Sequence, residues 1–96
     1  MLIGACRVKL YLPGCASLKE KRGRLKPLLA RLPKEFNVAV AEVGLNDVWQ
    51  SAEIALVTVA NGEAGFLHTE LQTMTRWIEQ HFGGDVEVED AQIELR

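Results

Sequence analysis

The residues with the clearest chemical potential lie near the start of the chain. Cys15 stands in the turn Pro13-Gly14-Cys15-Ala16-Ser17, directly before a predicted helix, and such turns present backbone amides to anions. A thiol nucleophile there, with an arginine six positions later, would suit phosphate-ester cleavage. The sixth residue after Cys15 is Lys21, which lacks the bidentate fork of arginine, and Arg22 comes one position too late. We therefore interpret Cys15 as a buried, inert thiol and assign no catalytic residue.

Basic residues gather on and just after the same predicted helix. Seven of the eleven Lys and Arg residues lie between positions 19 and 34, and only Glu20 and Glu35 are close enough to offset them. Positive charge clustered on one helix is typical of nucleic-acid binding, although solvated helix faces also carry charge. The candidate nucleic-acid or anion-binding residues are Lys19, Lys21, Arg22, Arg24, Lys26 and Arg31. The two histidines, His68 and His81, are too far apart on one helix to share a metal, so neither a metal nor a cofactor is predicted.

Length and composition indicate one soluble globular domain over residues 1–96, with 48% hydrophobic and 25% charged residues. No apolar run is long enough to cross a membrane, and no signal peptide is recognisable. Two cysteines without metal-binding spacing predict reduced thiols and a cytoplasmic location. Charge is uneven: residues 1–48 hold nine basic residues against four acids, and residues 49–96 hold two against nine. This asymmetry suits an anionic partner, or two halves that neutralise each other in the fold.

Hydrophobic periodicity predicts six elements that position these residues. Alternation predicts strands over residues 2–12, 36–43, 49–60 and 86–95, the last with a bulge near Glu89-Asp90. Ser17-Leu18-Lys19-Glu20 reads as a capping box, with Glu20 reaching back to the amide of Ser17. It opens a helix with a leucine stripe, in which Pro27 predicts a bend rather than a break. A second helix is predicted over residues 63–82.

The order β-α-β-β-α-β predicts a ferredoxin-like α+β fold, in which two helices cover one face of a four-stranded antiparallel sheet. Right-handed crossovers place the first and third strands at the centre and the fourth beside the first. Arg7 and Lys9 on the first strand are then expected opposite Glu87 and Glu89 on the fourth.

The sheet face away from the helices is the second candidate surface. Its residues are mostly small and apolar, which suits a twofold dimer, whereas an RNA-recognition sheet would need more aromatic residues. Trp49, at the predicted start of the third strand, is either a recognition anchor or a lid on the core. The candidate interaction residues are Ala5, Tyr11, Ala39, Ala41, Val43, Trp49 and Val57.

Three segments resemble the bacterial YlxP-like proteins, a family of unknown function. They are Ser17-Leu18-Lys19-Glu20-Lys21-Arg22, Phe36-Asn37-Val38-Ala39-Val40-Ala41-Glu42-Val43 and Asp47-Val48-Trp49-Gln50-Ser51-Ala52-Glu53. The resemblance covers essentially the whole chain and implies a ferredoxin-like fold and a cytoplasmic location. Because the genes of this family often neighbour those of a ribosome-binding factor and of translation initiation, it also implies a link to ribosome assembly or RNA.

Three functional hypotheses follow. The first is a non-catalytic module that binds rRNA or a ribosomal subunit through the basic helix. The second is a homodimeric protein-interaction or small-ligand module paired through the open sheet face, with the basic helix merely solvated. The third, least favoured, is an enzyme that acts on a phosphate ester at the Cys15 loop.

Overall fold

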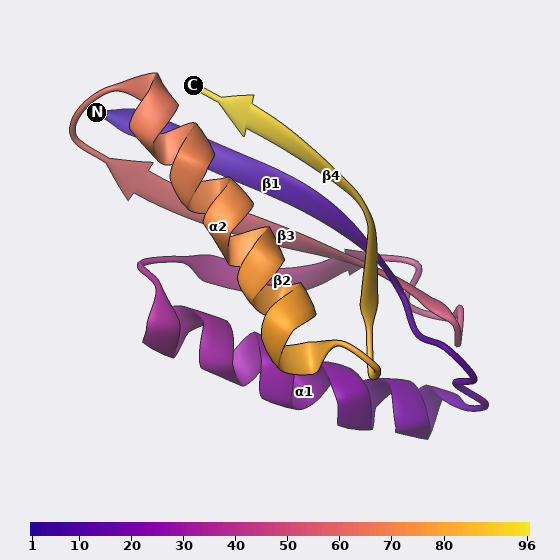
Figure 1. Ribbon diagram of the computed structural model, residues 1–96. Coiled ribbons are helices and arrows are strands. Elements are labelled where there is room, and N and C mark those ends of the chain that lie inside the picture. Colours follow the sequence, from indigo (N-terminus) through magenta and orange to yellow (C-terminus); the bar gives the residue numbers. More distant parts are fainter.

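The computed structural model describes all 96 residues and contains four strands and two helices in the predicted order. One antiparallel sheet has the strand order β2-β3-β1-β4. Both the ferredoxin-like fold and the strand order are thereby confirmed (Figure 1). The elements are β1 (Leu2–Tyr11), α1 (Leu18–Glu35), β2 (Ala39–Gly44), β3 (Ser51–Ala60), α2 (Ala64–Phe82) and β4 (Glu87–Leu95).

The core lies between the sheet and the two helices. In Figure 1, α2 crosses in front of the sheet, where it contacts β1 and β4, while α1 lies along the lower side and contacts β2. The even-numbered residues of β1 from Cys6 to Leu10 are buried, as their alternation predicts. From α2 the core receives six buried side chains on one face of the helix, namely Leu67, Leu71, Met74, Trp77, Ile78 and Phe82. Neither helix is long and apolar enough to span a membrane.

The first helix runs without interruption from Leu18 to Glu35, although Pro27 and Pro33 both lie inside it. A proline in a helix interior removes one backbone hydrogen bond and crowds the preceding turn. Both prolines are on the exposed side, so the leucines that hold α1 on the sheet are not displaced. Those leucines are Leu25, Leu28 and Leu32, each at most 3% exposed.

The connection between β2 and β3 differs from the prediction. Strand β3 begins at Ser51, so Trp49 and Gln50 belong to the loop rather than to the strand. At the other end of the loop the β2–β3 ladder is irregular after Glu42, and Leu45 has a φ of 59°, in the left-handed region that few residues other than glycine adopt. The alternation of apolar and polar residues cannot predict this backbone geometry, because the geometry depends on contacts between the loop and other elements.

The fourth strand carries the predicted bulge but not the predicted partners. The register with β1 shifts between Lys9 and Leu10, which leaves Glu89 as the extra residue. Because of this shift Arg7 and Lys9 lie opposite Gln92 and Asp90, so the predicted pairing with Glu87 and Glu89 is wrong. The ion pair of Arg7 is instead with Glu53 on β3, at 3.0 Å.

Candidate binding site at the first helix

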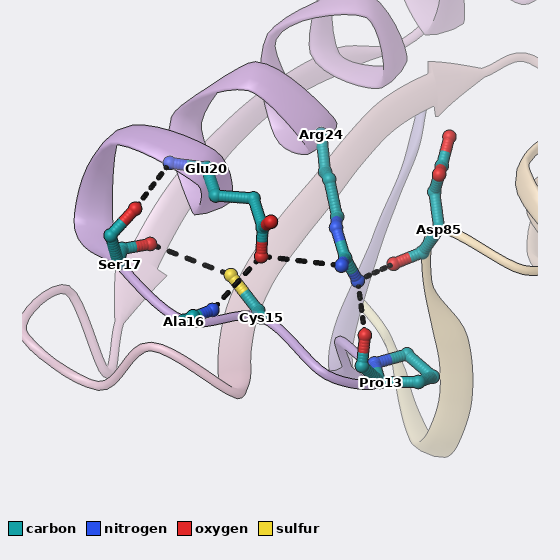
Figure 2. Close-up of polar contacts among 7 residues, drawn as sticks. All are labelled: Pro13, Cys15, Ala16, Ser17, Glu20, Arg24 and Asp85. Carbon is teal, nitrogen blue, oxygen red and sulfur yellow. Dashed lines mark hydrogen bonds and ion pairs between the residues drawn. The ribbon is translucent and has the colours of Figure 1, made fainter.

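The carboxylate of Glu20, a residue of α1 itself, accepts a hydrogen bond in the turn that precedes the helix (Figure 2). Ser17 Oγ accepts from the amide of Glu20 at 3.0 Å, as predicted, but Glu20 Oε2 accepts from the amide of Ala16 at 2.9 Å rather than from that of Ser17. The Ala16 amide, then the Cys15 thiol and the Arg24 guanidinium, hold the pKa of Glu20 below its ordinary value. The place where a helix N-terminus would receive an anion therefore already contains one.

Both cysteines are free and buried, each about 1% exposed. Cys15 Sγ lies 3.5 Å from the carbonyl oxygen of Ser17, to which it donates, so the thiol faces the loop backbone (Figure 2). On β1, burial together with the nearby Asp90 carboxylate raises the pKa of Cys6 to about 11. Neither thiol faces solvent as a nucleophile for a phosphate ester would have to.

Arg24 connects the turn before α1, the first turn of α1 and the α2–β4 turn. One guanidinium nitrogen, Nη1, donates to the carbonyl oxygens of Pro13 at 2.7 Å and of Asp85 at 3.0 Å. The other, Nη2, lies 3.3 Å from Glu20 Oε2 (Figure 2). The side chain is only 18% exposed. Arg24 therefore ties the α2–β4 turn to the start of α1 and is not free to bind an external anion.

Lys21 was predicted among the exposed basic residues, and the structure corrects this. Its side chain is 2% exposed, and Nζ donates to the carbonyl oxygens of Leu45 at 2.6 Å and Val48 at 2.7 Å. Nζ also lies 3.2 Å from Glu42 Oε2, an ion-pair distance at which the angles do not fit a hydrogen bond. This carboxylate oxygen is buried and has no other polar partner. The lysine thus fastens the β2–β3 loop to α1.

The burial of Lys21 could have been found in the sequence. It lies four residues before Leu25 and seven before Leu28, which is the spacing of the buried stripe itself. A lysine at such a position must find partners inside the protein, because an unpaired buried charge is very unfavourable. What the spacing could not show is that the partners would come from a loop more than twenty residues further along the chain.

Arg31 packs at the far end of α1, where its guanidinium carbon lies 5.2 Å from the ring centroid of Trp77 and 5.5 Å from that of Phe82. It also lies 3.9 Å from Glu35. Arg24 and Arg31 therefore share the flank of α1 that faces α2 and the turn after it.

Three of the candidate basic residues, Lys19, Arg22 and Lys26, are exposed and make no ion pair or side-chain hydrogen bond. Lys34, in the last turn of the helix, is exposed and unpaired in the same way. The two acids of α1 are already paired with Arg24 and Arg31. Several exposed positions between these basic residues carry small side chains, which leave the charges accessible. They are Gly23, Pro27, Ala30 and Pro33.

The open sheet face divides into two halves. Its apolar residues lie on β2, β3 and the start of β1, whereas charged residues lie along β4 and at the other end of β1 and β3, among them Arg7, Glu53, Asp90 and Glu94. Of the predicted interaction residues, Ala5 is half-buried and the others are exposed: Tyr11, Ala39, Ala41, Val43, Trp49 and Val57. Trp49 lies apart from this face, in the β2–β3 loop.

The three segments that resemble YlxP-like proteins meet at Lys21. The first supplies the lysine, the second supplies Glu42, and the third supplies the carbonyl of Val48. In the sequence the three are separate motifs. Their meeting point is a buried junction that fixes the shape of the loop bearing Trp49.

These features define a small ferredoxin-like α+β domain with one exposed cationic helix. The sequence profile of a family described as "Protein of unknown function (DUF503)" matches residues 3–93. The chain is also 32% identical over 78 residues to the "Uncharacterized protein YlxP" of Bacillus subtilis (strain 168), which covers 81% of this chain and 84% of that protein. The chain therefore belongs to the DUF503 family, and the resemblance seen in its motifs is confirmed.

Proposed function

We propose that the protein is a non-catalytic, cytoplasmic RNA-binding module that docks on ribosomal RNA through the outer face of α1. The observation that carries the proposal is the set of unpaired cations, Lys19, Arg22 and Lys26, on one exposed face of a single helix. Charges that a fold leaves without partners are available to neutralise phosphates, and on RNA this neutralisation releases counterions and favours binding.

The geometry of α1 suits a phosphate backbone. At a rise of about 1.5 Å per residue, Lys19 and Arg22 are separated by roughly 4.5 Å along the axis, and Arg22 and Lys26 by roughly 6 Å. Gly23 lies between Arg22 and Lys26, and Ala30 lies one turn after Lys26, so neither adds much bulk and a backbone can approach the helix closely. Because three buried leucines hold the opposite side of α1, the charges are presented on a rigid element.

The test is cosedimentation of the purified protein with ribosomal subunits at low and moderate salt. We expect wild-type binding that weakens steeply with salt, and much weaker binding by the triple variant K19Q/R22Q/K26Q. The slope of log affinity against log salt should become shallower by about 2 to 3, since each phosphate contact contributes roughly 0.7 to 0.9.

A control variant distinguishes binding through the surface of α1 from a general effect of the protein's net charge. K9Q/R76Q/R96Q removes the same number of charges from exposed positions outside α1. It should bind as the wild type does. Equal losses in the two variants, or no wild-type binding at either salt concentration, would contradict the proposal.

A homodimer paired through the open sheet face is a second candidate function. The observation in its favour is the exposure of neighbouring apolar side chains at one end of that face, including Ile3, Val57 and Val59 at 37%, 40% and 51%. Ala41 lies opposite Ala55 at the border of this region, where Ala55 in turn lies opposite Arg7. Replacing Ala41 by Glu should convert a dimer to a monomer in sedimentation equilibrium, because the carboxylate would be desolvated without a partner. A monomeric wild-type mass at micromolar concentration would rule the dimer out.

A further inference from the structure

The backbone of the β2–β3 loop is strained at Leu45 and accepts hydrogen bonds from other parts of the protein. Leu45 occupies the left-handed region, and its carbonyl accepts from both the amide of Val48 at 3.0 Å and Lys21 Nζ at 2.6 Å. At the end of the loop the carbonyl of Gln50 accepts from the amide of Leu12 at 2.8 Å. Strained backbone persists only where its surroundings enforce it, and it is concentrated at binding sites.

The same loop exposes apolar side chains. Trp49 is 50% exposed and Val48 is 44% exposed, whereas the only other tryptophan, Trp77, is 8% exposed and packs in the core. An exposed indole is a flat surface with only two rotatable side-chain bonds, so it loses little conformational freedom when another ring stacks on it.

The loop lies on the same side of α1 as the free cations. Arg24 and Arg31 lie on the flank that faces α2, where they contact Asp85, Trp77 and Phe82. The opposite flank, which carries Arg22 and Lys26, is therefore turned toward the edge strand β2, from which the loop leaves. Lys21 Nζ donates to the Val48 carbonyl, so the loop lies against the N-terminal end of α1, the end that also carries Arg22 on its exposed side. In Figure 1 the loop and the start of α1 lie at the same end of the molecule.

We infer that Trp49 is a stacking platform for one unpaired base of single-stranded RNA, whose flanking phosphates lie on Arg22 and Lys26. This inference rests on the RNA-binding function proposed above and adds the class of RNA to it. Proteins that bind single strands combine a positive surface with aromatic side chains in this way, and every base has a face that can stack. A purely double-stranded RNA offers its phosphates to α1 but no free base to the indole.

The test compares two ligands of equal length, an oligoadenylate and an abasic phosphodiester, in fluorescence titrations with the full-length protein. We expect W49A to bind oligoadenylate roughly 5- to 100-fold more weakly than the wild type, and to bind the abasic strand with unchanged affinity. W49F, which keeps an aromatic ring, should retain most of the affinity, and V48A serves as the matched control. Oligoadenylate should quench the indole emission of the wild type, and this quenching should vanish in W49A, which retains Trp77.

Several outcomes would overturn the inference. If W49A binds both ligands as the wild type does while K19Q/R22Q/K26Q loses both, α1 binds phosphates and Trp49 does not stack on bases. If W49A binds both ligands more weakly by the same factor, the residue acts on the shape of the loop or on the fold rather than on a base. Thermal unfolding of W49A distinguishes these two cases. If the wild type binds neither ligand, the RNA-binding proposal fails and the stacking site fails with it.

Discussion

Replacing Lys21 by methionine is expected to lower the free energy of unfolding by about 3 kcal/mol at pH 7, measured by urea denaturation. Methionine fills a similar volume but cannot donate to the carbonyls of Leu45 and Val48, which then lose their side-chain partner. The buried oxygen of Glu42 also loses the only cation near it. Since small domains are stable by about 5 to 15 kcal/mol, such a loss would be large.

Variants at the neighbouring positions separate these contributions. E42Q should lower the free energy of unfolding by less than K21M does, because Lys21 keeps both carbonyl acceptors. K21M/E42M should recover part of the loss, because it removes the orphaned carboxylate but not the orphaned carbonyls. K19M, at an exposed position two residues away, should change stability by less than about 0.5 kcal/mol. A K21M protein as stable as K19M would contradict the internal role of Lys21.

The sequence predicted most of the fold, because most of it is set by local periodicity. Alternation over residues 2–12 located β1 and its buried face, and the spacing of Leu25, Leu28 and Leu32 located α1. The bulge at Glu89 was predictable because the apolar residues on either side of it have opposite parity. In each case the pattern that a strand or helix needs to bury one face is written within a few consecutive residues.

The candidate site was less predictable, because charge counting does not show which cations the fold itself uses. Of the six predicted basic residues, Lys21 and Arg24 bind backbone carbonyls, and Arg31 packs on aromatic rings. Their partners lie between 11 and 61 residues away in sequence, and no local pattern encodes such contacts. The position of Trp49 in a loop was not predictable for the same reason, because the loop is held by contacts with Lys21, which belongs to α1.

Arg24 is expected to contribute strongly to stability through its carbonyl contacts. Replacing it by methionine should lower the free energy of unfolding by about 2 kcal/mol at pH 7, because two charge-assisted hydrogen bonds, to Pro13 and Asp85, are lost at a largely buried position. R22M, at an exposed and unpaired position in the same helix, is the matched control and should be nearly neutral. A loss of equal size in both variants would mean that charge on α1, not the carbonyl contacts, stabilises the fold.

The dependence of stability on pH tests the partner of Arg24. The pKa of Glu20 is lowered in the fold from 4.5, so its contribution is fully present above about pH 4.5 and is lost as the pH falls through the folded-state value. The amide of Ala16 is the largest cause and Arg24 the smallest. In R24M, the loss of stability at low pH that is due to Glu20 should therefore remain for the most part. In E20Q this loss should disappear. If R24M removed it as completely as E20Q does, the guanidinium rather than the amide would hold the carboxylate ionised.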